Sequence, residues 1–113
     1  MPLQSAPTDE RIHRLMTELR AGLEELYGSC LKGLYLYGSY ATGAADKGSD
    51  VDVLIVLDHI ARYSAEINRT SHLISSLSLR YTISMSRVFL TENDWENLDT
   101  PFLANVREEA VSA

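Results

Sequence analysis

Residues 34–57, LYLYGSYATGAADKGSDVDVLIVL, contain the strongest structural pattern in the chain. They indicate an apolar strand over Leu34–Tyr37, a Gly38-Ser39 turn, the start of a short helix, a polar loop and a second apolar strand. If the two strands pair, the turn lies beside the beginning of the second strand. We therefore expect a sheet with polar groups gathered at one end.

Two acidic residues, Asp50 and Asp52, stand where the second strand begins, with Val51 between them. In an extended backbone their side chains point to the same face, and their backbone positions are roughly 6.6 Å apart at ~3.3 Å per residue. Two carboxylates on one face repel each other, and near a low-dielectric core one becomes protonated unless a cation lies between them. Mg²⁺ suits this pair, because it takes one or two carboxylates and fills its other octahedral positions with water and substrate phosphate.

The Gly38-Ser39 turn suits the phosphate end of such a ligand. Glycine lets the backbone approach a ligand closely, and serine offers a hydroxyl and a backbone N–H. A helix that starts near Tyr40 points its free N–H groups at the same place, which is a common way to hold phosphate. Together with Asp50 and Asp52, the turn predicts a site for a nucleoside triphosphate and Mg²⁺.

The spacing of these residues resembles a known family signature. Gly38-Ser39, ten intervening residues and Asp50-Val51-Asp52 are similar to the motif of the DNA polymerase beta-like nucleotidyltransferase superfamily, and more closely to that of the minimal nucleotidyltransferases. The flanking residues agree as well: Tyr37, Ala41, Gly43, Ser49 and Val53–Val56. The resemblance implies an α/β (α+β) fold, with a small mixed β-sheet of three to four strands flanked by helices, in a single minimal nucleotidyltransferase domain over residues 1–113.

The resemblance also implies an activity, the Mg²⁺-dependent transfer of NMP from an NTP to a hydroxyl on a small molecule or protein. Asp50 and Asp52 match the catalytic, metal-binding acids of the family, and Gly38 and Ser39 match its phosphate-holding pair. ATP is the expected nucleotide.

Two further residues are candidates for nucleotide contact: Ser49, just before the acids, and Lys47 in the loop. Each motif also has a plainer interpretation. A Gly-Ser turn between strands is often only a connection, and Asp-x-Asp at a strand start is often a solvent-exposed junction between a turn and a strand. A third interpretation, an inactive relative whose acids are only structural, predicts no nucleotide binding.

The family pattern has one departure here, in the next strand along the chain. Residues 81–90 alternate between apolar and polar side chains, which predicts a half-buried strand. In the family this strand usually supplies a third acid, but no Asp or Glu lies between Glu66 and Glu92, and Ser84 or Ser86 takes the position. The third acid accepts the proton of the attacking hydroxyl, and losing a general base typically costs about 10²–10⁴-fold in rate. We therefore expect catalysis to be weakened more than nucleotide binding.

Helical spacing of apolar residues predicts helices on either side of this core. The first follows a Thr8 cap and stops at Gly28, with an apolar face made of Ile12, Leu15, Met16, Leu19, Leu23 and Leu26. A second helix covers roughly residues 61–79.

The last part of the chain predicts two short helices. Glu92 and Asp94, just past the third strand, are the alternative candidates for the third acid, although Thr91 and Asp94 are more typical of a helix cap. Pro101 fits the first turn of the next helix, which is expected to turn Arg107, Glu108 and Glu109 outward.

Composition limits the classes of protein and partner. With 113 residues, 45% of them hydrophobic and 23% charged, the chain is typical of one globular domain. The net charge of −6 disfavours binding to long nucleic acid. No apolar run approaches ~18 residues, so no membrane span is expected, and the first residues lack the pattern of a secretory signal. The single cysteine, Cys30, fits a reducing cytoplasm.

Two functions are compatible with these features. The first is the nucleotidyltransferase described above. The second is a nucleotide-binding interaction module with little or no catalysis, such as the antitoxin partner of a HEPN-type helical protein, a pairing that the family resemblance permits. A chain this short has little left with which to recognise an acceptor, so either a partner or a homo-oligomer is expected. Both functions hold together if the partner is itself the substrate.

Overall fold

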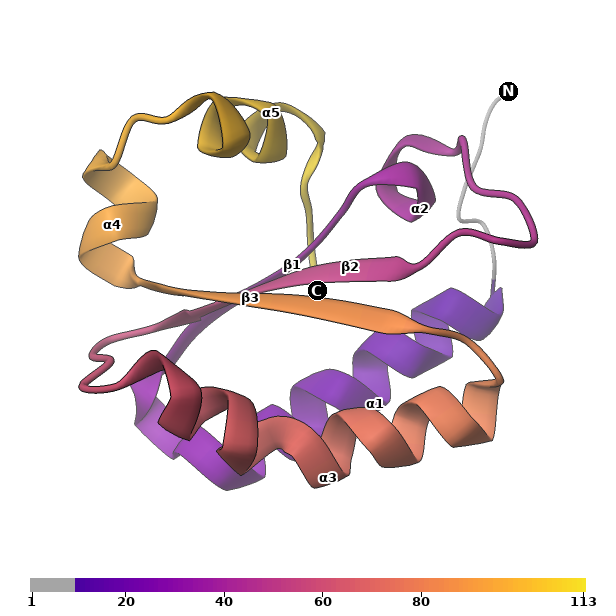
Figure 1. The fold of residues 1–113 in the computed structure, drawn as a ribbon, viewed down its shortest axis with the longest axis horizontal. Helices are drawn as coiled ribbons and strands as arrows, with labels where there is room; N and C mark the ends of the chain where they lie inside the picture. Colours follow the sequence, from indigo (N-terminus) through magenta and orange to yellow (C-terminus); the bar gives the residue numbers. More distant parts are fainter. Residues whose placement is uncertain (1–9) are drawn as a thin grey trace.

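The computed structural model describes residues 10–113, which form a four-stranded sheet with helices on both faces (Figure 1). In chain order the elements are α1 (Glu10–Tyr27), η1 (Gly28–Cys30), β1 (Leu31–Tyr37), α2 (Ser39–Thr42), β2 (Val51–Leu57), α3 (Tyr63–Tyr81), β3 (Met85–Thr91), α4 (Glu92–Asn97), α5 (Pro101–Glu109) and β4 (Val111–Ser112). The predicted mixed sheet flanked by helices is confirmed. Thr8, the predicted cap of the first helix, lies outside the described residues.

The strands follow the order β3-β2-β1-β4. β1 pairs antiparallel with β2 and β4, whereas β2 and β3 are parallel and are connected through α3. The strands expected from residues 34–57 do pair, with Leu34 opposite Ile55 and Tyr37 opposite Asp52. β2 lies inside the sheet, and its run from Val53 to Leu57 is buried because helices cover both of its faces.

Side chains of β2 alternate between two apolar layers. Val51, Val53 and Ile55 pack in the larger core with α1 and α3, whereas Leu54 and Val56 pack in a smaller core with Val106 of α5. Figure 1 shows the same arrangement, with α1 and α3 on one side of the sheet and α4 and α5 on the other. Asp52 shares the parity of Leu54 and Val56, so its side chain belongs to the face covered by α4 and α5.

Several bounds of the predicted helices and strands differ from the structure. β1 begins at Leu31, three residues before the predicted Leu34. Leu26, assigned to the apolar face of the first helix, is 41% exposed, although the other five residues of that face are buried. The strand predicted from Tyr81 begins only at Met85, because α3 continues to Tyr81 and Thr82 ends it in a left-handed conformation (φ +52°). Alternation over a short segment did not separate the end of a helix from the start of a strand.

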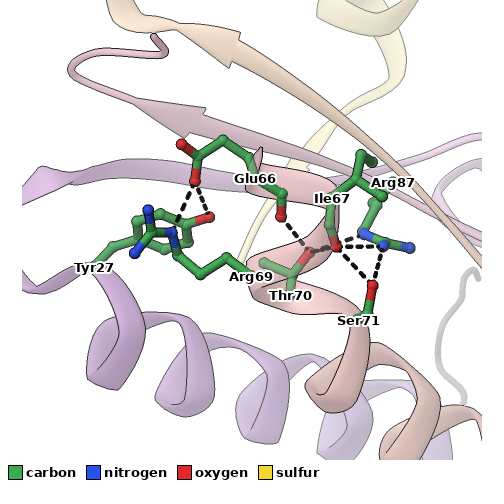
Figure 2. A network of polar contacts seen from close by, with 7 residues as sticks. All are labelled: Tyr27, Glu66, Ile67, Arg69, Thr70, Ser71 and Arg87. Carbon is green, nitrogen blue, oxygen red and sulfur yellow. Dashed lines mark hydrogen bonds and ion pairs between the residues drawn. The ribbon is translucent and has the colours of Figure 1, made fainter. Parts of the chain in front are cut away.

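A buried acid connects the two long helices (Figure 2). Glu66 of α3 is only 7% exposed, and its Oε1 accepts hydrogen bonds from the Tyr27 hydroxyl of α1 (2.6 Å) and from Arg69 Nε (3.1 Å). On the same helix, Thr70 Oγ1 accepts from Nε of Arg87 in β3 (2.9 Å). These contacts fix α3 to both α1 and the sheet. Within residues 10–113, no helix is both long and apolar enough to cross a membrane.

Candidate functional site

The predicted site residues meet at one end of the sheet, where β1 ends and β2 and β3 begin. Asp52 lies opposite Tyr37 of β1 and beside Ser86 of β3. Asp50 is exposed just before β2, and the backbone N–H of Val51 donates to Ser84 O at 2.9 Å, which extends the pairing toward Asp50. The pairing of β1, β2 and β3 therefore positions the two acids at this end of the sheet.

The turn at Gly38 touches the second acid. Gly38 has φ +76° and ψ −159°, a conformation that is essentially restricted to glycine. A Cβ placed on this residue would lie 2.3 Å from Asp52 Oδ2, so only glycine leaves room for the carboxylate. The structure thus brings together Gly38 and Asp52, which the sequence separates by a loop.

The helix expected near Tyr40 is present as the single turn α2, which begins at Ser39. Ala41 and Thr42 donate their backbone N–H groups to Gly38 O at 3.0 and 3.2 Å. The N–H groups of Ser39 and Tyr40 precede the first intrahelical donor, Ala41 N, and have no acceptor within the helix, so they are available to a ligand oxygen.

The other two candidates, Ser49 and Lys47, lie in the loop between α2 and β2. The Ser49 hydroxyl accepts from the backbone N–H of Asp46 at 2.9 Å, and Asp46 Oδ1 accepts from Gly48 N at 3.0 Å. These bonds shape the loop that leads into Asp50. Lys47 is exposed in the same loop. The proposed contacts of Ser49 and Lys47 with a nucleotide stay predictions.

Sequence reasoning missed one residue of the site, Glu109. It was expected to face outward, but Gly38 N donates to Glu109 Oε1 at 2.8 Å. Glu109 is the last residue of α5, and the chain then turns into β4 beside β1, which brings the carboxylate to a turn 71 positions earlier in the sequence. Helical spacing alone gives no sign of this contact, because it depends on how the chain returns to the sheet.

The acids of the site influence one another. Burial raises the pKa of the Asp52 carboxyl above its usual value, and the nearby Asp50 and Glu109 carboxylates raise it further. Burial also raises the pKa of the Tyr37 hydroxyl, followed by the effect of Asp52. The site is therefore an electronegative end of the sheet where an added cation is favoured.

The donor set fits Mg²⁺ shared with a substrate. Within residues 10–113, no three His, Cys, Asp or Glu side chains are grouped as a complete metal site. Mg²⁺ does not require such a cage, since one or two carboxylates with substrate phosphates and water complete its shell. Asp50 and Asp52 are the residues that would hold it, and Ser86, exposed and in register with Asp52, adds no third carboxylate from β3.

Comparison with solved structures shows the same fold. A candidate nucleotidyltransferase from Sulfolobus solfataricus superimposes with a TM-score of 0.63 at 18% identity, over 99% of this chain and 89% of that one. A chain of a toxin–antitoxin complex with AMP-PNP gives 0.60 at 19% identity, over 83% and 68%. A Shewanella oneidensis complex of a tri-AMPylated HEPN toxin with its MNT antitoxin gives 0.51 at 15% identity, over 87% and 70%.

Sequence comparison adds the family. Spectinomycin 9-adenylyltransferase of Staphylococcus aureus is 46% identical over 37 residues, which are 33% of this chain and only 14% of that enzyme. The family described as nucleotidyltransferase domain matches residues 16–99, a range that includes the Gly38-Ser39 turn, Asp50 and Asp52. Since that match covers most of the sequence, the chain belongs to the nucleotidyltransferase domain family.

Proposed function

We propose that this protein transfers NMP from an NTP, with ATP as the expected nucleotide, to a hydroxyl acceptor. The observation that carries the proposal is the contact between the Gly38 turn and Asp52, with Asp50 beside them at the same end of the sheet. An anion-binding turn and a pair of acids are the two halves of a site for a metal-bound triphosphate. Family membership supports the same reaction class.

Each residue has a role in this proposal. The N–H and hydroxyl of Ser39, with the N–H of Gly38, donate to phosphate oxygens and fix the triphosphate. Asp50 and Asp52 hold Mg²⁺, which when bound neutralises phosphate charge. The acceptor oxygen then forms a bond to the α-phosphorus as pyrophosphate leaves, so most of the catalysis is positioning and charge neutralisation.

Ser86 is the reason why we expect a low rate of NMP transfer. It stands in register with Asp52, where a carboxylate would accept the proton of the attacking hydroxyl. A proton released to water instead of to a general base costs about 10²–10⁴-fold. We therefore propose a slow transferase.

The acceptor proposed here is a protein. One neighbour in structure is an MNT antitoxin bound to a tri-AMPylated HEPN toxin. Most of residues 10–113 belong to the sheet and its covering helices, so few of these residues are left to recognise an acceptor. A HEPN-type helical partner, modified on a hydroxyl, agrees with both points.

The transfer can be tested with ATP labelled at the α-phosphate, Mg²⁺ and a co-expressed HEPN-type partner. We expect label on the partner with wild-type protein and none with Asp52→Asn. Asp58→Asn, which removes an exposed acid from the far end of β2, is the matched control and should keep the activity. Equal labelling by wild type and Asp52→Asn would contradict the proposal.

A second candidate function is a nucleotide-binding interaction module without transfer, favoured by the serine at position 86. In that case the protein forms a stable complex with its partner and binds Mg-ATP, but no label reaches the partner. The same experiment therefore separates the two functions.

A further inference from the structure

The Glu109 carboxylate accepts a hydrogen bond from the Gly38 backbone N–H, which is a donor assigned to phosphate in the proposed site. Gly38 N donates to Glu109 Oε1 at 2.8 Å, which is an ordinary charge-assisted hydrogen bond. A carboxylate oxygen and a phosphate oxygen are acceptors of the same kind, and one backbone N–H makes one strong bond. The two acceptors therefore exclude each other at Gly38.

The backbone around Glu109 is held in place independently of this bond. Thr100 Oγ1 caps the start of α5 by accepting from Leu103 N at 3.2 Å, and Val106 is buried under the helix. After the helix, Val111 pairs with Leu36 of β1, two residues before Gly38. Because both ends of the segment are anchored, rotation of the Glu109 side chain is enough to free the N–H.

The negative charges of Asp52 and Glu109 oppose nucleotide binding at the turn, as the hydrogen bond between Glu109 and Gly38 does. Asp52 Oδ2 lies on another side of Gly38, 2.3 Å from where a Cβ would be, and Glu109 adds a further negative charge to the turn. A triphosphate approaching the turn meets both the occupied N–H and this repulsion. Glu109 lies outside residues 16–99, the range matched by the nucleotidyltransferase domain family.

We propose that Glu109 is a built-in competitor of the nucleotide, which closes the Gly38 turn until a triphosphate displaces it. The inference rests on the proposed nucleotide site and adds a means of regulation to it. Any interaction that draws the Glu109 side chain away from the turn opens the site.

The test is calorimetric titration of Mg-ATP into wild type, Glu109→Ala and Glu108→Ala. Glu108 is exposed, lies next to Glu109 on α5 and has the same charge, so its variant controls for net charge and helix composition. Loss of one charge-assisted competitor predicts an affinity about tenfold tighter for Glu109→Ala, and almost unchanged for Glu108→Ala. The Gly38 amide proton resonance should also move upfield in Glu109→Ala without nucleotide, which reports the lost bond directly.

The outcomes separate this inference from the proposed function. Unchanged or weaker binding by Glu109→Ala, with wild-type binding intact, contradicts the competitor; weaker binding would mean that Glu109 assists the metal or nucleotide. Absence of binding by wild type and both variants contradicts the nucleotide site itself and the competitor with it.

Discussion

At the scale of single residues, Gly38 is the most constrained position of the site. It combines a conformation that other residues avoid with a Cβ position 2.3 Å from Asp52 Oδ2. We predict that Gly38→Ala destabilises the protein by about 1–3 kcal/mol from backbone strain, with a further loss from the clash, and abolishes Mg-ATP binding. Urea denaturation and calorimetry measure the two effects.

The control for this substitution is Gly28→Ala. Gly28 also has a positive φ (+55°), but a Cβ there meets nothing within 4 Å and the residue lies beyond the site, at the end of α1. This variant should lose stability from strain alone and keep nucleotide affinity. If Gly38→Ala bound Mg-ATP as well as Gly28→Ala does, the close approach at the turn would have no role in binding.

The ionised Asp52 carboxylate is expected to lower the free energy of unfolding, although the proposed site requires it. Burial, Asp50 and Glu109 raise its pKa above the ordinary 3.8, so the folded protein holds this proton more tightly than the unfolded chain does. The wild type therefore loses stability as pH rises from 3.8 through the raised pKa. We predict that Asp52→Asn has a higher Tm than wild type at pH 7 in metal-free buffer, with the difference shrinking below pH 3.8.

Thermal melts of Asp58→Asn provide the comparison, since Asp58 is exposed at the opposite end of β2. A Tm for Asp52→Asn at neutral pH that is equal to or below that of wild type would show that the ionised carboxylate carries no folding cost.

At the scale of elements, the contact between α1 and α3 depends on Glu66. Its buried carboxylate accepts from Tyr27 of one helix and Arg69 of the other (Figure 2). Tyr27→Phe leaves this acid with one partner fewer, and a hydrogen bond to a charged group contributes about 1.5–3 kcal/mol. We predict a loss of that size in the free energy of unfolding, measured by urea denaturation.

Glu24→Gln is the surface counterpart of that change. Glu24 pairs with Arg20 on the exposed side of α1 at 3.3 Å, and such pairs contribute only about 0.3–0.5 kcal/mol. Equal losses for Tyr27→Phe and Glu24→Gln would mean that burial of Glu66 adds nothing to the connection between the helices.

The elements also show how far the sequence could predict the fold. Strong local patterns predicted β1 and β2, the turn at Gly38 and the cap of α4, where Thr91 Oγ1 accepts from Asp94 N at 3.1 Å. Each depends on neighbours within a few positions. The end of α3 was misplaced because apolar spacing over a few residues fits both a helix and a strand.

The residues of the candidate site also fall into those that the sequence could group and one that it could not. Asp50, Asp52 and Gly38 could be grouped in advance because strand pairing places them together. Glu109 could not, since its position depends on the docking of α5 against the face of the sheet that carries Asp52 and on the return of the chain into β4.

At the scale of the whole molecule, the two layers of helices have different positions relative to the acids. α1 and α3 cover the face away from Asp52, and α4 and α5 lie over the face that carries it (Figure 1). Glu109 of α5 also contacts the Gly38 turn. Access of a nucleotide to the proposed site is therefore controlled by the C-terminal part of the chain.

The net charge of −6 also acts at this scale. We predict no binding to a long, labelled DNA duplex at low salt, measured by fluorescence anisotropy, because an acidic protein releases no counterions from the phosphate backbone. Binding that weakens steeply with added salt would contradict this prediction and reveal a basic surface.

The proposed function requires Asp50, Asp52 and the Gly38-Ser39 turn to form one Mg-nucleotide site, and calorimetric titration of Mg-ATP measures whether they do. We predict saturable heat with wild type, the same affinity with the distant control Asp58→Asn, and no binding heat with Asp50→Asn. Equal binding by wild type and Asp50→Asn, or no binding by wild type, would contradict the claim.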